Sequence, residues 1–260
     1  MCAPRADTRV RPYLWLLGLV VFYALMTPLL TVEGITKYFN RRRVLDDVRF
    51  SVRRGEVLGL IGPNGSGKTT LFECLAGLMP ANAGTIKSDD KVLSSSQRKA
   101  TLFYLPDGIT PWAEQSVSWV LGFFRNLYRR STADASALVE PLRLEQLMKA
   151  RIGSLSKGER KRVLVALGLL TPHPLLMLDE PFDGLDLRQT RDAMSLLKAH
   201  AASGRTLMLS IHQLIDAGRV CDRLVLLSGG QVVGEGSLPE LRTRANLTDA
   251  GVEEIFLALT

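Results

Sequence analysis

The sequence predicts an α/β protein built on a mainly parallel sheet. Two short, wholly apolar runs, Val57–Ile61 and Leu175–Leu178, suit strands that are buried on both faces, as parallel strands are. A glycine-rich loop and a helical pattern follow the first run, while two adjacent carboxylates end the second. Strand, loop and helix in this order are typical of α/β proteins, which bind ligands at the carboxyl ends of their strands.

The length and composition fit one large globular domain. A chain of 260 residues, 46% apolar and 23% charged, can bury a good core and still carry an inserted lobe. The net charge of +7 is spread over short basic runs, which favours a solvated surface over binding to nucleic acid or an anionic membrane. Cys2, Cys74 and Cys221 lie far apart, without metal-ligand or disulfide spacing, which fits a reducing compartment.

An apolar N-terminal extension, residues 1–28, precedes the predicted domain, residues 29–260. No charge occurs from Pro12 to Val32, but Leu29–Ile35 is predicted as the first strand, which leaves an apolar segment of about fifteen residues. Three interpretations stay open: an over-extended start with translation beginning at Met26, a membrane-associating segment, and a signal peptide. The start at Met26 is the favoured interpretation.

The loop that follows Val57–Ile61 matches the pattern GxxxxGK[ST] at residues 62–69. Its glycines let successive N–H groups point inward around phosphates, and the helix that follows favours the anion at its N-terminus. Lys68 can reach the β- and γ-phosphates, and the Thr69 hydroxyl can ligate Mg²⁺. The residues expected to contact the nucleotide are Gly62, Pro63, Asn64, Gly65, Ser66, Gly67, Lys68, Thr69 and Thr70. Many classes of nucleotide-binding protein share this loop.

The candidate catalytic side chains come after the second and third apolar strands. Asp179 ends the second strand and suits a Mg²⁺ shell, and Glu180 can polarise water as a general base. The run TLMLSI predicts a third strand, with His212 just past its end as a γ-phosphate contact. The expected catalytic residues are Glu180, His212 and Lys68.

A second anion site is predicted at the turn Leu155–Glu159, which reads LSKGE and opens a helix with an apolar face. Ser156 suits the N-cap position, where its hydroxyl and the free amides of the helix start can bind an anion. The turn precedes the acidic strand, so the site faces outward and cannot serve the chain's own phosphate loop.

Together these motifs resemble an ATP-binding-cassette (ABC) ATPase. The order is the phosphate loop at 62–69, the signature-like LSKGE, the acidic strand at 175–180, the D-loop Gly184–Asp186 and the switch histidine His212. The resemblance runs from about Leu29 to Thr260. It implies a core of the P-loop NTPase type, an N-terminal antiparallel β subdomain and an inserted helical lobe at about 110–160.

The resemblance also implies ATP and Mg²⁺ as cofactors and assigns further residues. Tyr38 stands at the place of the family's adenine-stacking aromatic. Ser156, Gly158 and Asp186 are expected to contact the ATP of a second chain. Thr69, Asp179 and Asp107 are the expected metal ligands, the last one directly or through water, because Asp107 replaces a longer glutamine. The signature also departs from the family at Lys157, where glycine is usual.

The string LSGGQ itself occurs at 227–231, after the switch histidine and between the apolar runs Leu224–Leu227 and Gln231–Val233. No helical pattern follows it. We therefore predict a Gly-Gly hairpin turn here, and no nucleotide contact.

The family resemblance predicts the ATPase subunit of a transporter, peripheral on the cytoplasmic face of the membrane. Its partners would be a transmembrane permease subunit and a second ABC ATPase chain. The ending VEEIFLALT and the loop YLPDG resemble exporters. Residues 112–150 would form the lobe that contacts the membrane subunit, and their aromatic residues are either contacts or core.

The alternative is a soluble ABC ATPase that acts on nucleic acid or ribosomes. Lys68 and Ser156 lie 88 positions apart, which is a transporter spacing with no room for a long coiled coil, and the chain has one cassette. No nucleic acid is expected as a partner.

Overall fold

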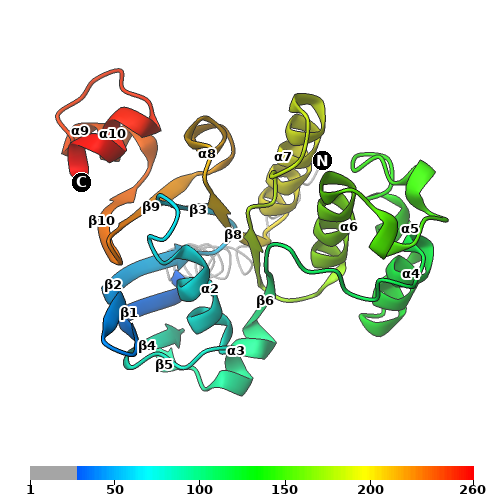
Figure 1. Ribbon diagram of the computed structural model, residues 1–260, viewed down its shortest axis with the longest axis horizontal. Coiled ribbons are helices and arrows are strands. Elements are labelled where there is room, and N and C mark those ends of the chain that lie inside the picture. The colour runs from blue at the N-terminus through cyan, green and yellow to red at the C-terminus, as the bar shows by residue number, and fades with distance from the viewer. Residues whose placement is uncertain (1–27) are drawn as a thin grey trace, which may run out of the picture.

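The computed structural model describes residues 28–260, so the three interpretations of the N-terminal extension lie outside the described residues. Two sheets form the centre of the molecule, and helices cover the larger sheet and extend to one side as a lobe (Figure 1).

The larger sheet has six strands in the order β10-β9-β3-β8-β7-β6, and every neighbouring pair except β9 with β10 is parallel. This confirms the predicted mainly parallel sheet. The predicted runs at 57–61 and 175–178 are buried at every residue because layers cover both faces. The strands are β3 (Val57–Ile61), β6 (Leu102–Leu105), β7 (Leu175–Asp179), β8 (Thr206–Ile211), β9 (Arg223–Ser228) and β10 (Gln231–Gly236).

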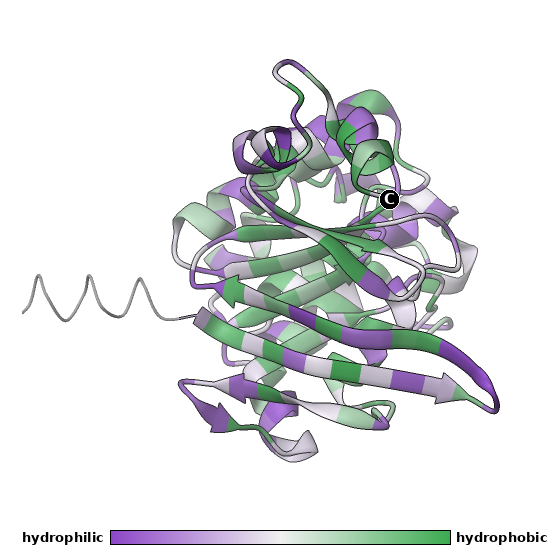
Figure 2. Cartoon of the chain, turned by 90° about the vertical axis from the view of Figure 1, so that its left-hand side faces the viewer, coloured by the Kyte–Doolittle hydropathy of each residue, from purple (hydrophilic) through white to green (hydrophobic). Residues whose placement is uncertain are grey.

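The smaller sheet is antiparallel, in the order β2-β1-β4-β5, and confirms the predicted N-terminal β subdomain. Buried and more exposed residues alternate over much of its two long strands. Hydrophobic and hydrophilic colours also alternate along these strands in Figure 2. One side of this sheet therefore packs inward while the other meets solvent. The strands are β1 (Pro28–Phe39), β2 (Arg42–Arg53), β4 (Ala83–Ser88) and β5 (Lys91–Val92).

The helices divide between the sheets and the lobe. The lobe expected at about 110–160 contains α4, α5 and two 3₁₀ turns, and it is followed by α6, which packs against α4 (Figure 1). The helices are α2 (Lys68–Ala76), α3 (Ser95–Thr101), α4 (Val117–Leu127), α5 (Thr132–Ser136), α6 (Lys157–Leu170), α7 (Leu187–Ala202), α8 (Leu214–Val220), α9 (Leu238–Arg244) and α10 (Val252–Leu259). The 3₁₀ turns are η1 (Glu145–Leu147) and η2 (Ile152–Ser154).

The core consists of two apolar clusters, one on each face of the central sheet. Along β7, Leu176 and Leu178 join the cluster that includes residues of α4, α6 and α7, whereas Leu175 and Met177 join the cluster that includes α2 and the antiparallel sheet. Successive side chains of a strand point to opposite faces, so one strand supplies both clusters. The carboxyl ends of β3, β7 and β8 are thereby fixed side by side.

The LSGGQ string forms the turn between β9 and β10, which confirms the predicted hairpin. Gly229 and Gly230 both have left-handed backbones, with φ of +55° and +83°, as a two-residue hairpin turn requires. A Cβ on Gly230 would lie 2.3 Å from the carbonyl oxygen of Val44, and the Gly230 carbonyl accepts a hydrogen bond from the N–H of Asp46 at 2.9 Å. The turn is thus a packing contact between the two sheets.

Candidate active site

The phosphate loop, residues 62–69, connects the end of β3 to the start of α2. A Cβ on Gly62 would lie 2.3 Å from the carbonyl oxygen of Leu227, and Gly67 has φ of +107°. Glycine is therefore required at both positions by the backbone itself. Helix α2 has no side-chain cap, so its first N–H groups are available to an anion.

Two polar groups inside this loop fit a bound phosphate. The Lys68 ammonium is buried and donates to the carbonyl oxygens of Gly62 at 2.7 Å and Pro63 at 3.2 Å. Burial lowers the pKa of Lys68, and the charges of Glu180 and Asp179 oppose this shift. The Ser66 hydroxyl is buried and has no hydrogen-bond partner among the described residues. A ligand oxygen would satisfy such groups.

Two of the three side chains expected to hold Mg²⁺, Thr69 and Asp179, are in contact. The Thr69 hydroxyl donates to Asp179 Oδ2 at 3.1 Å, although 110 positions separate the two residues. Tyr104 donates to the same oxygen at 3.3 Å, and the Ser210 hydroxyl donates to Asp179 Oδ1. A carboxylate beside a hydroxyl is a donor set that suits Mg²⁺.

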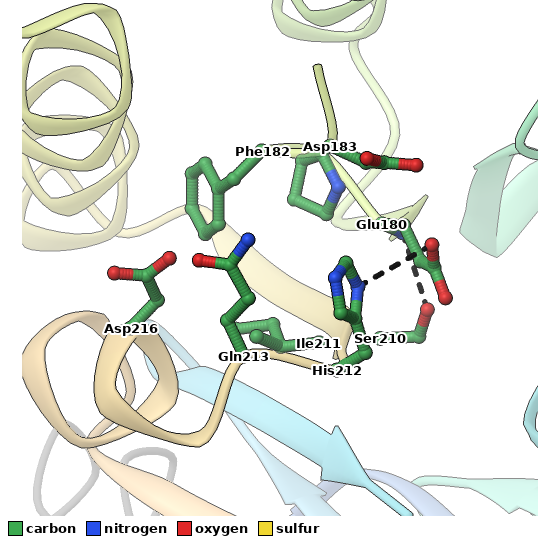
Figure 3. A pocket seen from close by; sticks show the side chains of 9 residues that line it. Glu180, Phe182, Asp183, Ser210, Ile211, His212, Gln213 and Asp216 are labelled. Atoms are coloured by element: carbon green, nitrogen blue, oxygen red, sulfur yellow. Dashed lines mark hydrogen bonds and ion pairs between the residues drawn. The ribbon is translucent and has the colours of Figure 1, made fainter. Parts of the chain in front are cut away.

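Glu180 follows Asp179 at the end of β7 and is held by the neighbouring strand (Figure 3). Its N–H donates to the carbonyl oxygen of Ser210 at 3.1 Å and to the Ser210 hydroxyl at 3.2 Å. His212 Nδ1 lies 3.4 Å from Glu180 Oε2, so the two predicted catalytic side chains meet. Glu180 also has a left-handed backbone, with φ of +49°, which is unusual for a residue other than glycine.

A recess beside the phosphate loop is lined by six of the nine loop residues predicted to contact the nucleotide. The aromatic residue in its wall is Phe39 and not Tyr38, although the two side chains are almost equally exposed, 43% and 42%. The Lys37 ammonium lies 5.3 Å from the centre of the Phe39 ring. The recess is lined by Phe39, Arg42, Val44, Asn64, Gly65, Gly67, Lys68, Thr69, Thr70 and Glu180.

The LSKGE turn forms the start of α6 as predicted, with Ser156 as the N-cap in a capping box. The Ser156 hydroxyl accepts a hydrogen bond from the N–H of Glu159 at 3.3 Å, and Glu159 Oε2 accepts one from the N–H of Ser156 at 2.8 Å. Ser156 and Lys157 are exposed. Gly158 packs so closely on the D-loop that a Cβ would lie 2.2 Å from the carbonyl oxygen of Gly184.

Two acidic residues next to this turn, Asp183 and Asp107, are paired with lysines. Lys157 forms an ion pair with Asp183, and Lys161 Nζ lies 2.6 Å from Asp107 Oδ1. Burial alone would raise the pKa of Asp107, but the hydrogen bond and charge of Lys161, together with Lys157, outweigh it and lower that pKa. Carboxylate oxygens of Asp107, Glu180 and Asp183 lie within 4.8 Å of one another.

Asp186 caps helix α7 in this structure. Its Oδ1 accepts hydrogen bonds from the N–H groups of Arg188 at 2.9 Å and Gln189 at 2.8 Å. This carboxylate therefore has its own partners within the chain.

The site can be compared with known proteins. Residues 45–183, more than half of the chain, match the family model described as ABC transporter. The chain belongs to the ABC transporter family. It is an ATP-binding and ATP-hydrolysing subunit of such a transporter, which implies a membrane partner subunit.

Relatives and solved structures agree with this assignment. The chain is 34% identical over 226 residues to the Nod factor export ATP-binding protein I of Ralstonia nicotianae, covering 84% of this chain and 70% of the relative. It is 32% identical over 237 residues to the lipopolysaccharide export system ATP-binding protein LptB of Escherichia coli, covering 88% and 96%. A solved structure of the ATP binding subunit of an ABC transporter superposes with a TM-score of 0.80 at 31% identity, covering 89% of this chain and 99% of that one.

In the described part of this ABC subunit, residues 28–260, no helix has both the length and the apolar composition that a membrane crossing requires.

Sequence reasoning missed several residues of the site, among them Phe39, Tyr104, Lys161 and Ser210. Ser210 had a visible signal, because it is the one hydroxyl inside the run LMLSI, and β8 pairs it directly with Asp179. Tyr104 and Lys161 become part of the site only through contacts between distant elements, which no local pattern reveals.

Proposed function

We propose that this subunit works as a dimer in which each ATP lies between the phosphate loop of one chain and the LSKGE turn of its partner. The arrangement of the two anion sites carries this proposal. Helix α2 and helix α6 lie on opposite sides of β6 and β8 in Figure 1, and the cap of α6 is exposed. A second chain can bring its exposed cap to the phosphate loop.

The chain's own residues divide the chemistry among them. Lys68 and the amides of the phosphate loop bind and orient the phosphates, while Thr69 and Asp179 would hold Mg²⁺. Asp107, the third ligand that the resemblance suggests, is paired with Lys161 instead. Bound Mg²⁺ supplies positive charge against the phosphate oxygens. Glu180 accepts a proton from the attacking water, and His212 orients Glu180 and contacts the γ-phosphate.

For the adenine we propose Phe39 as the stacking residue in place of Tyr38. Phe39 lines the recess that also contains Lys68 and Thr69, and Tyr38 does not. An aromatic ring beside the phosphate loop offers a flat surface on which a base can stack.

We propose export through a separate membrane subunit, with this chain peripheral on the cytoplasmic side. The names of both relatives refer to export. On the lobe, Trp112, Trp119 and Phe123 are 43%, 45% and 38% exposed, and Trp119 stacks on Phe123 at 5.4 Å. Exposed aromatic groups of this kind mark interaction surfaces. Phe124, in contrast, is buried in the lobe.

The variant Glu180→Gln tests the proposed dimer. The amide keeps the size of the side chain but accepts no proton, so hydrolysis should fall by about 10²–10⁴-fold. ATP binding should survive, because Lys68, Thr69 and Asp179 are unchanged. Size-exclusion chromatography with light scattering, at millimolar ATP, should then show an ATP-dependent dimer.

The matched control is Glu180→Gln combined with Ser156→Asp. Aspartate is as good an N-cap as serine but places a negative charge where the partner's γ-phosphate would bind. This double variant should stay monomeric in ATP. An unchanged hydrolysis rate in Glu180→Gln would remove Glu180 from its role, and an equal dimer in both variants would remove the LSKGE turn from the interface.

A further inference from the structure

Lys161 is a buried cation on α6 that contacts two residues at the edge of the active site, Asp107 and Asp179. Its side chain is only 6% exposed. The ammonium donates to Asp107 Oδ1 at 2.6 Å and to the backbone carbonyl oxygen of Asp179 at 2.9 Å. Asp107 follows β6 and Asp179 ends β7. One ammonium therefore joins three elements at the carboxyl edge of the central sheet.

The bond to Asp179 reaches the backbone from which the catalytic carboxylates project. The side chain of Asp179 accepts hydrogen bonds from Thr69 and Tyr104, and its carbonyl, held by Lys161, belongs to the peptide that leads into Glu180. Glu180 has a left-handed backbone at this point. A conformation of this kind persists only where neighbouring contacts hold it, and Lys161 provides one such contact.

Helix α6 carries this cation together with the signature turn. Lys157 lies one helical turn before Lys161 and pairs with Asp183, while Ser156 caps the helix. Two lysines on one face of α6 thus attach the start of the helix to the edge that carries Asp179 and Glu180.

The two partners of the ion pair depend on each other. A buried ammonium is stable only with a compensating charge or a full set of acceptors. Asp107, whose side chain is 33% exposed, supplies that charge. A neutral amide at position 107 would leave Lys161 with carbonyl contacts alone.

We propose that Lys161 and Asp107 act as a positioning pair for ATP hydrolysis: the ammonium fixes the peptide between Asp179 and Glu180, and Asp107 serves as its counter-ion. This inference rests on the proposed roles of Asp179 and Glu180. It predicts that loss of either partner slows the chemical step and leaves nucleotide binding by the phosphate loop nearly unchanged.

A double-mutant cycle tests the pair in the full chain. The variants are Lys161→Met, Asp107→Asn and their combination, with Asp107→Glu as the conservative variant and Lys198→Met, an exposed lysine of α7, as the control. The measurements are kcat and KM for ATP, the Mg²⁺ concentration at half-maximal rate, and the affinity for a fluorescent ATP analogue without hydrolysis.

We expect each single variant to lower kcat by about 10-fold or more, a size that direct coupling between contacting residues allows. The KM and the analogue affinity should change by less than about 3-fold, since the phosphate loop is untouched. The combined variant should be no slower than the slower single variant. Asp107→Glu should keep most of the rate, and Lys198→Met all of it.

Independent effects that multiply in the combined variant would overturn the proposal. So would a raised Mg²⁺ requirement in Asp107→Asn that Lys161→Met does not share, because Asp107 would then act as a metal ligand. Circular dichroism shows whether Lys161→Met folds. If it does not, the kcat values of Asp107→Asn and Asp107→Glu test the proposal by themselves, and equal kcat values would contradict the role of Asp107 as counter-ion. Glu180→Gln in the same assay tests the proposed function separately from the positioning pair. Full activity of this variant would overturn the assignment of Glu180 as the general base.

Discussion

Among single residues, Phe39 has the clearest consequence for ATP binding. A base stacked on an aromatic side chain is worth about 1–3 kcal/mol by alanine substitution, so Phe39→Ala should weaken ATP affinity by roughly 5- to 150-fold. Tyr38→Ala is the matched control, because Tyr38 is equally exposed but does not line the recess. The ATP affinity of Tyr38→Ala should change by less than about 2-fold.

Isothermal titration with the Glu180→Gln background, which prevents turnover, measures both affinities. A larger loss of ATP affinity in Tyr38→Ala than in Phe39→Ala would assign the adenine contact to Tyr38, as the family resemblance suggests.

The family resemblance points to Tyr38, whereas Phe39 lines the recess, and the pairing of the strand explains the difference. The pairing of β1 with β2 shifts register between Ile35 and Lys37 and again between Lys37 and Tyr38. Each shift changes which side chains share a face, so counting alternate residues from the sequence fails at this point. The phosphate loop, in contrast, was predictable as a motif, because one contiguous pattern of residues, 62–69, defines it.

At the scale of elements, the two serine-glycine turns should respond differently to the same change. Ser156→Asp keeps the cap of α6 but sets a carboxylate against the partner's γ-phosphate. Like charges brought together at an interface cost several kcal/mol, so turnover should fall by about 10²-fold or more. Ser228→Asp, at the β9–β10 hairpin, should change turnover by less than about 2-fold.

Steady-state ATPase rates at saturating ATP, with thermal melting to show that both variants fold, provide the measurement. The assignment of the two turns would be reversed if Ser228→Asp were inactive and Ser156→Asp fully active.

Most elements around the site were predictable because each has a strong local pattern: the apolar runs of β3 and β7, the capped start of α6, the Gly-Gly turn at 229–230. The contacts between elements were not. Ser210 and Asp179 meet through the register of two strands that lie far apart in the sequence, and Lys161 reaches Asp107 across 54 positions. Such contacts follow from tertiary packing, which the local periodicity of a sequence does not reveal.

For the whole molecule, the exposed aromatic residues of the lobe set the expected partner. Trp119→Arg should weaken association with the membrane subunit by about 30-fold, since a central tryptophan is commonly worth 2 kcal/mol or more at an interface. The chain's basal ATPase rate should stay the same, because the lobe surface contributes nothing to the phosphate loop.

Tagged chain purified from detergent-solubilised membranes of its own cells, with mass spectrometry of multi-span proteins, measures the association. Leu257→Arg, at an exposed leucine of α10 that is 69% accessible, is the control and should retain the membrane protein. Equal recovery with Trp119→Arg would place the docking surface elsewhere.

The left-handed backbone at Glu180 lowers the stability of the fold at a position where ATP hydrolysis needs a glutamate. A non-glycine residue in this conformation costs about 1–2 kcal/mol, and asparagine tolerates it better than glutamate does. Asparagine is nevertheless too short, and too weak a base, to replace the carboxylate beside His212. Selection for heat resistance alone would therefore drift toward chains that bind ATP and no longer turn it over, and any engineering of this subunit for robustness should leave position 180 out of its library.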